Sequence, residues 1–156
     1  MKIIKIDHDN RYFREIFKIY KNWLIESKYE FDEKKSLEEY MNSFNEDTLP
    51  NIYALIINDT LIGMYELSAK DYIEDKPYTP YLSRVYVKEE YRNKGYGTML
   101  IEHSINTAKG LNFKKLYLHT HHTNLYEKYG FKYLEDVKTP YGIKKIYELK
   151  IKSTSK

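Results

Sequence analysis

The amino-acid sequence predicts a mixed α/β (α+β) fold in which helices cover the faces of one sheet. Runs that alternate apolar and polar residues, as strands do, interleave with runs whose apolar residues recur every three or four positions, as in amphipathic helices. The 156 residues are 42% hydrophobic and 31% charged, which is ordinary for one globular domain. The predicted order is β-α-α-β-β-β-α-β-α-β-β. We expect a single domain over residues 1–152 and a frayed tail at 153–156.

The first half of the chain contains a predicted strand, two helices and a hairpin. Residues 1–7 alternate like a half-buried strand, and Asn10 can cap a helix that runs to about Ser27. Its apolar face comprises Phe13, Ile16, Phe17, Tyr20, Trp23 and Leu24. Ser36 to Glu39 has the form of a capping box for a second helix, with Leu37, Tyr40, Met41 and Phe44 on one face. After Pro50, two strand-like runs around Asn58 and Asp59 indicate a hairpin over residues 51–69.

The second half begins with a polar loop from Asp71 to Pro80. A strand is predicted at 81–89, followed by a glycine-containing turn and a helix from Thr98 to Lys109 that Gly110 ends. Residues 113–120 form a further predicted strand, and Asn124 to Tyr129 fits a short helix ended by Gly130. Two closing strands are joined across residues 139–142.

Composition excludes several classes of function. The chain has no cysteine, so disulfides, thiolate nucleophiles and zinc-thiolate sites are excluded. The net charge is +3, with Lys and Arg spread along the chain, which favours a solvated surface over a nucleic-acid site. No window approaches the roughly 20 apolar residues that span a bilayer, and the N-terminus turns charged too early for a secretion signal. We therefore expect a cytoplasmic protein whose partners include neither nucleic acid nor membrane.

The stretch Tyr91-Arg-Asn-Lys-Gly-Tyr-Gly-Thr-Met-Leu100 has the chemistry of an anion site. The first N–H groups of a helix have no partner within the helix, and the helix dipole adds positive charge there. Gly95 and Gly97 remove the Cβ atoms that would hold a phosphate away, and Arg92 and Lys94 add two cations. The Walker pattern fails because the lysine precedes the glycine, and the dinucleotide pattern fails because Leu100 replaces the third glycine.

Residues 85–102, VYVKEEYRNKGYGTMLIE, resemble the acetyl-coenzyme A binding segment of the GNAT family of N-acetyltransferases. That family's Arg/Gln-x-x-Gly-x-Gly/Ala pattern is matched by Arg92 to Gly97, and its Tyr-x-x-x-Gly-Phe element is matched by Tyr126 to Phe131. The resemblance implies a twisted, mostly antiparallel sheet of about seven strands. It also implies acetyl-CoA as co-substrate, with no metal, and a primary amine as acceptor.

The resemblance assigns roles to individual residues. The backbone of Val85, Tyr86 and Val87 pairs with the pantetheine arm like an added strand. The pyrophosphate lies against the N–H groups of Arg92, Asn93, Lys94, Gly95, Tyr96, Gly97 and Thr98. Tyr126 falls near the sulfur of the cofactor. Many family members carry an asparagine about six residues before that tyrosine; this chain has Asn124 in the region at a different spacing.

Acetyl transfer also needs a proton acceptor for the amine. A lysine-like amine of pKa about 10.4 lies roughly 3.4 units, or ~4.6 kcal/mol, from its neutral form at pH 7. Glu66 stands where a base often lies in this family, with Tyr65 and Leu67 facing the other side of the sheet. A solvent-facing glutamate is the alternative, and Ser83 is a lesser candidate for positioning water. Tyr126 is expected to hydrogen-bond the sulfur, because a phenol is a weaker acid than a thiol.

Other features allow alternative interpretations. His119 and His121 share a strand face, like a pair of metal ligands, but no cysteine or acidic cluster completes a shell; a wall of the acceptor pocket is the preferred interpretation. The acidic, aromatic segment 71–78 either recruits a cationic amine or is a solvated loop. We expect a small-molecule acceptor and a possible homodimer. The rival functions are an acyl-CoA binding module without turnover, a peptide or protein acetyltransferase, and a nucleic-acid-binding protein.

Overall fold

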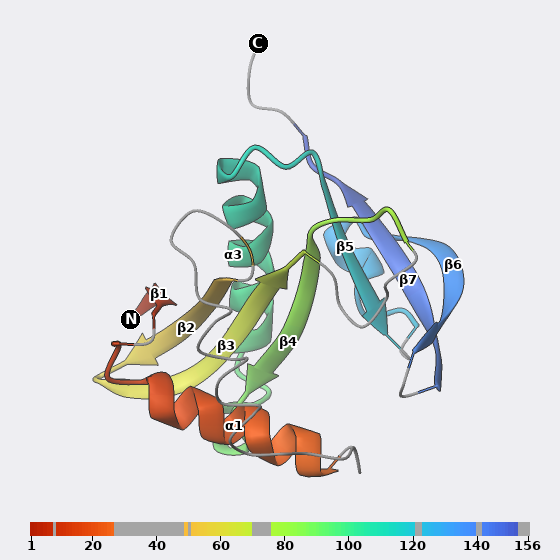
Figure 1. Ribbon diagram of the computed structural model, residues 1–156. Coiled ribbons are helices and arrows are strands. Elements are labelled where there is room, and N and C mark those ends of the chain that lie inside the picture. The colour runs from red at the N-terminus through yellow and green to blue at the C-terminus, as the bar shows by residue number, and fades with distance from the viewer. Residues whose placement is uncertain are drawn as a thin grey trace.

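The computed structural model describes residues 1–7, 9–26, 49, 51–69, 76–120, 123–139 and 142–152. These residues form a seven-stranded sheet in the order β1-β2-β3-β4-β5-β7-β6 (Figure 1). Every pair of neighbouring strands is antiparallel except β4 and β5. The predicted mixed fold with a mostly antiparallel sheet is thus confirmed. The strands are β1 Lys2–Ile6, β2 Asn51–Ile57, β3 Thr60–Ser68, β4 Tyr81–Val87, β5 Lys115–Thr120, β6 Lys132–Thr139 and β7 Gly142–Lys150.

Among the described residues, helices α1 and α3 cover opposite faces of the sheet (Figure 1). Helix α1, Phe13–Glu26, follows a turn in which the Asn10 side chain accepts a hydrogen bond from the Tyr12 N–H at 2.9 Å. It packs on a core that includes Ile16, Ile52 and Met64. Helix α3, Tyr96–Gly110, packs on the other face, where the core includes Leu100, Tyr65 and Leu67. The alternation of side chains along β3 therefore sends Met64 toward α1 and its neighbour Tyr65 toward α3.

Several predicted boundaries are confirmed and others shift. Asn58 and Asp59 adopt φ of 50° and 60° in the predicted hairpin turn, as a tight two-residue connection requires. Helix α3 begins two residues before the predicted Thr98, and the left-handed residue beyond its end is Asn112, with φ of 67°. A 3-10 turn, η1 Glu89–Tyr91, precedes it and was not predicted. The predicted helix at 124–129 is shorter than expected: only η2, Glu127–Tyr129, is helical before Gly130.

Some predicted features lie outside the described residues. These are the second helix near Ser36 to Phe44, the acidic part of the 71–78 segment and His121. The described part of that segment is anchored to the sheet: Lys76 and Tyr78 both donate hydrogen bonds to Glu135 of β6. The Tyr78 ring also stacks on Tyr117 with centroids 4.8 Å apart. Residues 76–80 are therefore held in place by side-chain contacts.

The parallel neighbours β4 and β5 meet at one end only. Their pairing is confined to Tyr81 and Tyr117, supported by a hydrogen bond of 3.0 Å from the Tyr117 N–H to the Pro80 carbonyl. Beyond this point the two strands diverge (Figure 1). The edge of β4 from Ser83 to Val87 consequently has no ladder with β5 among the described residues.

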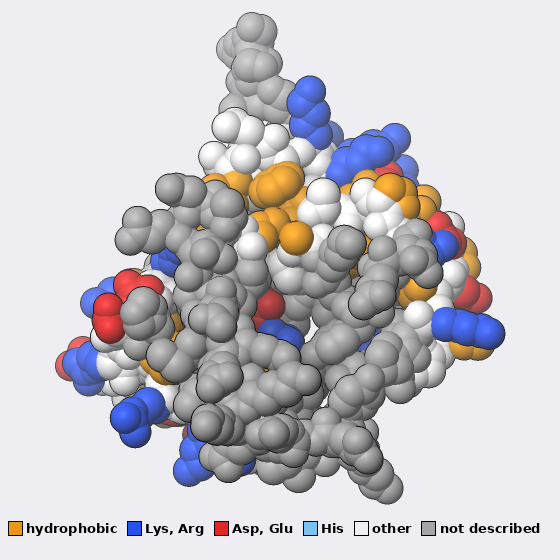
Figure 2. Space-filling model, in the orientation of Figure 1, with side chains coloured by type: hydrophobic (Ala, Val, Ile, Leu, Met, Phe, Trp, Pro, Cys, Tyr) orange, Lys and Arg blue, Asp and Glu red, His pale blue; other side chains and the backbone are white. Residues whose placement is uncertain are grey.

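On the face shown in Figure 2, the Lys and Arg side chains stand in separate groups. None of the helices that the structure describes is both long enough and apolar enough to cross a membrane.

Candidate active site

The predicted anion site forms a cradle between β4 and α3. Asn93 and Gly95 take left-handed φ of 65° and 86°, so the chain turns sharply before the helix begins. The Met99 N–H makes an intrahelical bond to the Gly95 carbonyl at 3.2 Å. The N–H groups of Tyr96, Gly97 and Thr98 precede that bond, as the first donors of a helix do, and suit an anion. Alternating left-handed residues also make a concave nest of N–H groups.

The two glycines of this cradle leave open space above its backbone. A Cβ atom built on either Gly95 or Gly97 meets no heavy atom within 4 Å. Protein packing therefore does not demand glycine at position 97, where φ is also unstrained. A side chain larger than a methyl group there would instead occupy the space that a phosphate needs to reach the N–H groups. The residues present fit a pyrophosphate.

Two cations flank the cradle. Arg92 donates a hydrogen bond from Nε to the Val87 carbonyl at 2.8 Å, and its guanidinium lies 5.6 Å from the Tyr86 ring centroid. The Lys94 Nζ lies 5.8 Å from the centroid of Tyr91. Both side chains are exposed, so their heads stay in solvent where they can meet an anion.

Strand β4 presents a backbone edge beside this cradle. On its other edge, Tyr86 pairs with Met64 and Val87 pairs with Gly63. The edge that faces β5 has no strand partner along Val85 to Val87 among the described residues. Such an edge can hydrogen-bond an extended chain in the manner of an added strand.

The predicted tyrosine lies on a segment tied to the cradle. Tyr126 is half-buried and its ring meets Phe131 edge-on at 6.1 Å. Burial, with a smaller effect of Tyr129, raises the pKa of the Tyr126 phenol above its usual value of 10. The Tyr129 hydroxyl lies 2.8 Å from the Thr98 Oγ1, within hydrogen-bond distance. This contact fixes η2 to the first turn of α3.

Asn124, the other predicted residue of this segment, is exposed and left-handed, with φ of 62°. Its N–H donates to the Glu127 carboxylate at 2.9 Å. The backbone of Asn124 therefore closes the turn that precedes η2. Its contribution to cofactor binding stays a prediction.

Glu66 lies on the opposite face of β3 from Tyr65 and Leu67, as predicted, in the direction of α1. It is buried, with 6% of its surface exposed, so the alternative of a solvent-facing glutamate is wrong.

The Glu66 carboxylate forms an ion pair with the Arg84 guanidinium, which lies 4.3 Å from the Tyr20 ring centroid. Ser83 bonds the Ser68 hydroxyl at 2.9 Å beside this pair. A cavity of about 60 Å³ adjoins it, lined by Ile19, Tyr20, Met64, Arg84, Val85 and Tyr86.

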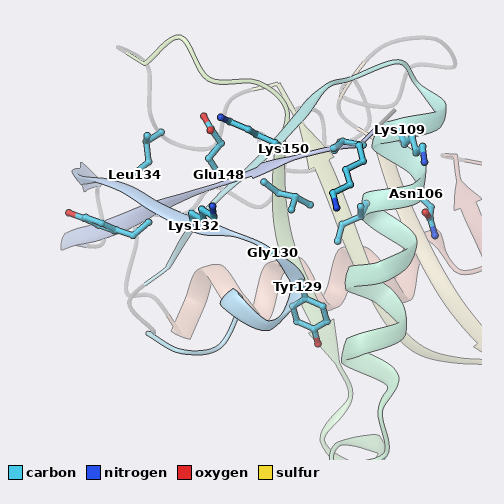
Figure 3. A pocket seen from close by; sticks show the side chains of 13 residues that line it. Asn106, Lys109, Tyr129, Gly130, Lys132, Leu134, Glu148 and Lys150 are labelled. Carbon is cyan, nitrogen blue, oxygen red and sulfur yellow. The ribbon is translucent and has the colours of Figure 1, made fainter. Parts of the chain in front are cut away.

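A larger hollow of about 740 Å³ lies on the side of α3, between the helix, the start of β6 and the end of β7 (Figure 3). Of the described residues between β5 and β6, only those of the short turn η2 are helical. Tyr129 lines the end of the hollow away from Lys109, as Figure 3 shows. Because the hydroxyl of Tyr129 also contacts Thr98, the hollow adjoins the cradle.

His119, the described member of the predicted histidine pair, is half-buried on β5 and its ring contacts Tyr81 at 6.4 Å. Among the described residues, no group of three or more His, Cys, Asp or Glu side chains is placed to hold a metal ion.

Sequence reasoning missed three residues that shape the site. Arg84 is the partner of Glu66, and only its charge within a largely apolar strand hinted at this. Tyr129 lies within hydrogen-bond distance of Thr98 from a segment in which only Asn124 and Tyr126 had been given roles. Gly63 allows β3 to approach β4, because a Cβ there would lie 2.5 Å from the Tyr86 carbonyl. A glycine inside a strand is a recognised sign of such close approach.

Comparison with known proteins agrees with this geometry. The model of the Acetyltransferase (GNAT) family matches residues 13–131, and the chain therefore belongs to that family. No curated protein was found to match the chain.

Solved structures share the fold at low sequence identity. A GNAT family acetyltransferase from Elizabethkingia anophelis with acetyl-CoA bound has a TM-score of 0.63 and 20% identity, over 96% of this chain and 97% of that one. An aminoglycoside 6'-N-acetyltransferase complexed with coenzyme A has a TM-score of 0.73 and 17% identity, over 100% of both chains. The ribosomal-protein-S18-alanine N-acetyltransferase from Escherichia coli has a TM-score of 0.66 and 17% identity, over 99% of this chain and 96% of that one.

Proposed function

We propose that this protein transfers an acetyl group from acetyl-CoA to a primary amine of a small molecule. The observation that carries the proposal is the continuity of three features: the open cradle at Gly95 and Gly97, the edge of β4 that has no strand partner among the described residues, and Tyr126 on a segment bonded to the same helix turn. Family membership and two solved relatives holding acetyl-CoA or coenzyme A support the choice of donor.

The cradle and the strand edge hold the donor in this proposal. The N–H groups from Arg92 to Thr98 bind the pyrophosphate, and the main chain of Val85 to Val87 pairs with the pantetheine arm. When bound, acetyl-CoA supplies a thioester whose carbonyl carbon receives the amine and whose sulfur departs. A backbone N–H near Val85 polarises the carbonyl oxygen, as preorganised donors do in acyl transfer.

Two side chains assist the reaction, one as a proton acceptor and one as a hydrogen-bond donor. Glu66, directly or through a water positioned near Ser83, accepts the proton that the amine loses. Tyr126 donates a hydrogen bond to the sulfur as negative charge develops there. Because the pKa of Tyr126 is raised above 10 while a thiol lies near 8.5, full proton transfer to sulfur is uphill by more than ~2 kcal/mol. Hydrogen bonding is therefore the role that this tyrosine can perform.

The proposal is tested by incubating the purified protein with acetyl-CoA and a panel of amines. The panel contains arylalkylamines, polyamines, aminoglycosides, amino acids and peptides with free N-termini. Thiol release and a mass increase of one acetyl group in the acceptor are the expected results. Glu66→Gln and Tyr126→Phe serve as variants that should lose rate while retaining coenzyme A binding.

The alternatives give different results in the same assay. Binding of acetyl-CoA without turnover of any amine would identify a non-catalytic acyl-CoA module instead. Acetylation confined to peptides would identify a peptide or protein acetyltransferase, the activity that the name of one solved relative describes.

A further inference from the structure

The ion pair between Glu66 and Arg84 depends on an irregularity of β4. In the ladder of β3 and β4, Glu66 lies opposite Ser83, whereas Met64 lies opposite Tyr86. Two residues of β4, Arg84 and Val85, therefore oppose the single residue Tyr65. This is the arrangement of a β-bulge, which re-aims side chains next to functional sites.

The bulge changes the face to which Arg84 points. Val85 packs with the core on the α3 side, and Tyr86 packs with the core on the α1 side. Ser83 bonds Ser68, which lies on the α1 side because it is two residues from Glu66. In a regular strand Arg84 would face α3 and its apolar core. As the inserted residue it instead reaches Glu66 and the Tyr20 ring of α1.

This arrangement requires an unfavourable backbone conformation. Arg84 has φ of 50°, in the left-handed region that residues with a Cβ rarely adopt. The glycine that would relieve this strain is absent, although the chain uses glycine at other turns. Strain of this kind persists where the surrounding structure compensates for it and is common at active sites. Here the compensation includes a buried ion pair, with the side chains of Arg84 and Glu66 only 17% and 8% exposed.

We propose that Arg84 is a positioning residue: its guanidinium keeps the buried Glu66 carboxylate ionised and holds it in one orientation for accepting the amine proton. A neutral carboxylic acid cannot accept a proton, and burial without a partner favours the neutral acid. Arg84 thus makes it possible for a buried carboxylate to serve as the acceptor. The kinetic part of this inference rests on the proposed function, whereas the ionisation of Glu66 does not.

The other elements around Glu66 contribute few charges among the described residues. Strand β2 places Ile52 opposite it. Helix α1 contributes Tyr20 and the half-buried Lys21, together with Glu15, whose carboxylate forms an ion pair with Lys88. Arg84 is in direct contact with the Glu66 carboxylate.

The first experiment follows the carboxyl carbons of the glutamates by NMR during a pH titration of protein labelled with ¹³C-glutamate. The Glu66 signal is assigned by its loss in Glu66→Gln. In Arg84→Gln, which keeps a Cβ and so the same backbone strain, the Glu66 midpoint is expected to rise by about one to three pH units. Arg84→Lys retains the charge and should bring the midpoint back toward the wild-type value. Arg84→Met is a second uncharged variant in case Arg84→Gln does not fold.

Lys88→Gln is the matched control, because it removes a cation just beyond the end of β4 whose ion pair is with Glu15. It should leave the Glu66 midpoint unchanged. A Glu66 midpoint that is the same in wild type, Arg84→Gln and Arg84→Met would overturn the inference.

The second experiment measures kcat against pH with an acceptor found in the amine panel. In Arg84→Gln, kcat should fall as the pH is lowered through the Glu66 midpoint that NMR gives for this variant. Wild-type kcat should show no such fall at that pH. If the Glu66 midpoint moves in Arg84→Gln but the dependence of kcat on pH stays that of wild type, the role of Arg84 in proton acceptance is overturned. Absence of turnover with every amine would instead count against the proposed function, and the titration would still report on the ion pair.

Discussion

The substitution Gly97→Val separates an anion cradle from an ordinary turn. In the folded protein the new Cβ meets no heavy atom within 4 Å, and residue 97 has no left-handed φ. Valine has a slightly higher helix propensity than glycine, so the free energy of unfolding should stay about the same. The branched side chain is larger than the glycine or alanine of the family pattern and would crowd a phosphate bound at the N–H groups. The affinity for coenzyme A is therefore expected to fall while the stability of the free protein is kept.

The size of the loss follows from the contacts that a phosphate makes at a helix N-terminus. A hydrogen bond to a charged group contributes about 1.5–3 kcal/mol. Loss of one such bond weakens binding by roughly 10- to 150-fold, at about 1.4 kcal/mol per factor of ten. Isothermal titration calorimetry with coenzyme A at constant ionic strength measures this directly, and thermal unfolding reports the stability.

Two further glycine variants serve as controls for this measurement. Gly110→Val makes the same change at the last residue of α3, where a Cβ also meets nothing within 4 Å, and should leave the Kd unaltered. Gly95→Ala forces a left-handed residue with φ of 86° to carry a Cβ, so both stability and affinity should fall, the former by about 1–3 kcal/mol. Wild-type affinity in Gly97→Val would refute the cradle.

Further substitutions test the other parts of the site. Tyr126→Phe should lower kcat about 10- to 150-fold with little change in KM for acetyl-CoA, because it removes one hydrogen bond to developing charge. Since burial raises the pKa of Tyr126 above 10, the phenol keeps its proton at lower pH, and kcat should show no loss from its ionisation below about pH 10. Tyr129→Phe removes the contact with Thr98 and should mainly raise KM for acetyl-CoA. Steady-state measurement of kcat and KM for both variants therefore distinguishes the two tyrosines. Gly63→Ala places a Cβ 2.5 Å from the Tyr86 carbonyl and should destabilise the protein by about 1–3 kcal/mol in urea unfolding.

The sequence predicted the elements of the fold wherever local signals decide them. The hairpin at Asn58 and Asp59 depends on two adjacent residues that tolerate a left-handed φ. Alternation along β3 correctly placed the side chains of Glu66 and Tyr65 on opposite faces of the sheet. The bulge at Arg84 could not be found in this way, because it is a relation between two strands. Nothing in the sequence of β4 alone shows that Arg84 and Val85 share one partner. The contact of Tyr129 with Thr98 is likewise a long-range one.

The proposed donor site is easier to recognise than the acceptor site because the two are built from different atoms. The cradle and the β4 edge offer main-chain groups, which every residue carries, so the sequence is constrained chiefly where a side chain would intrude, at Gly95 and Gly97. An acceptor pocket depends on side chains. Two solved structures with this fold, each 17% identical to the chain, bear names that specify an aminoglycoside and a ribosomal protein as acceptors. The fold alone therefore does not specify the acceptor, and a search for the acceptor of this protein should vary the body of the amine while keeping the donor constant.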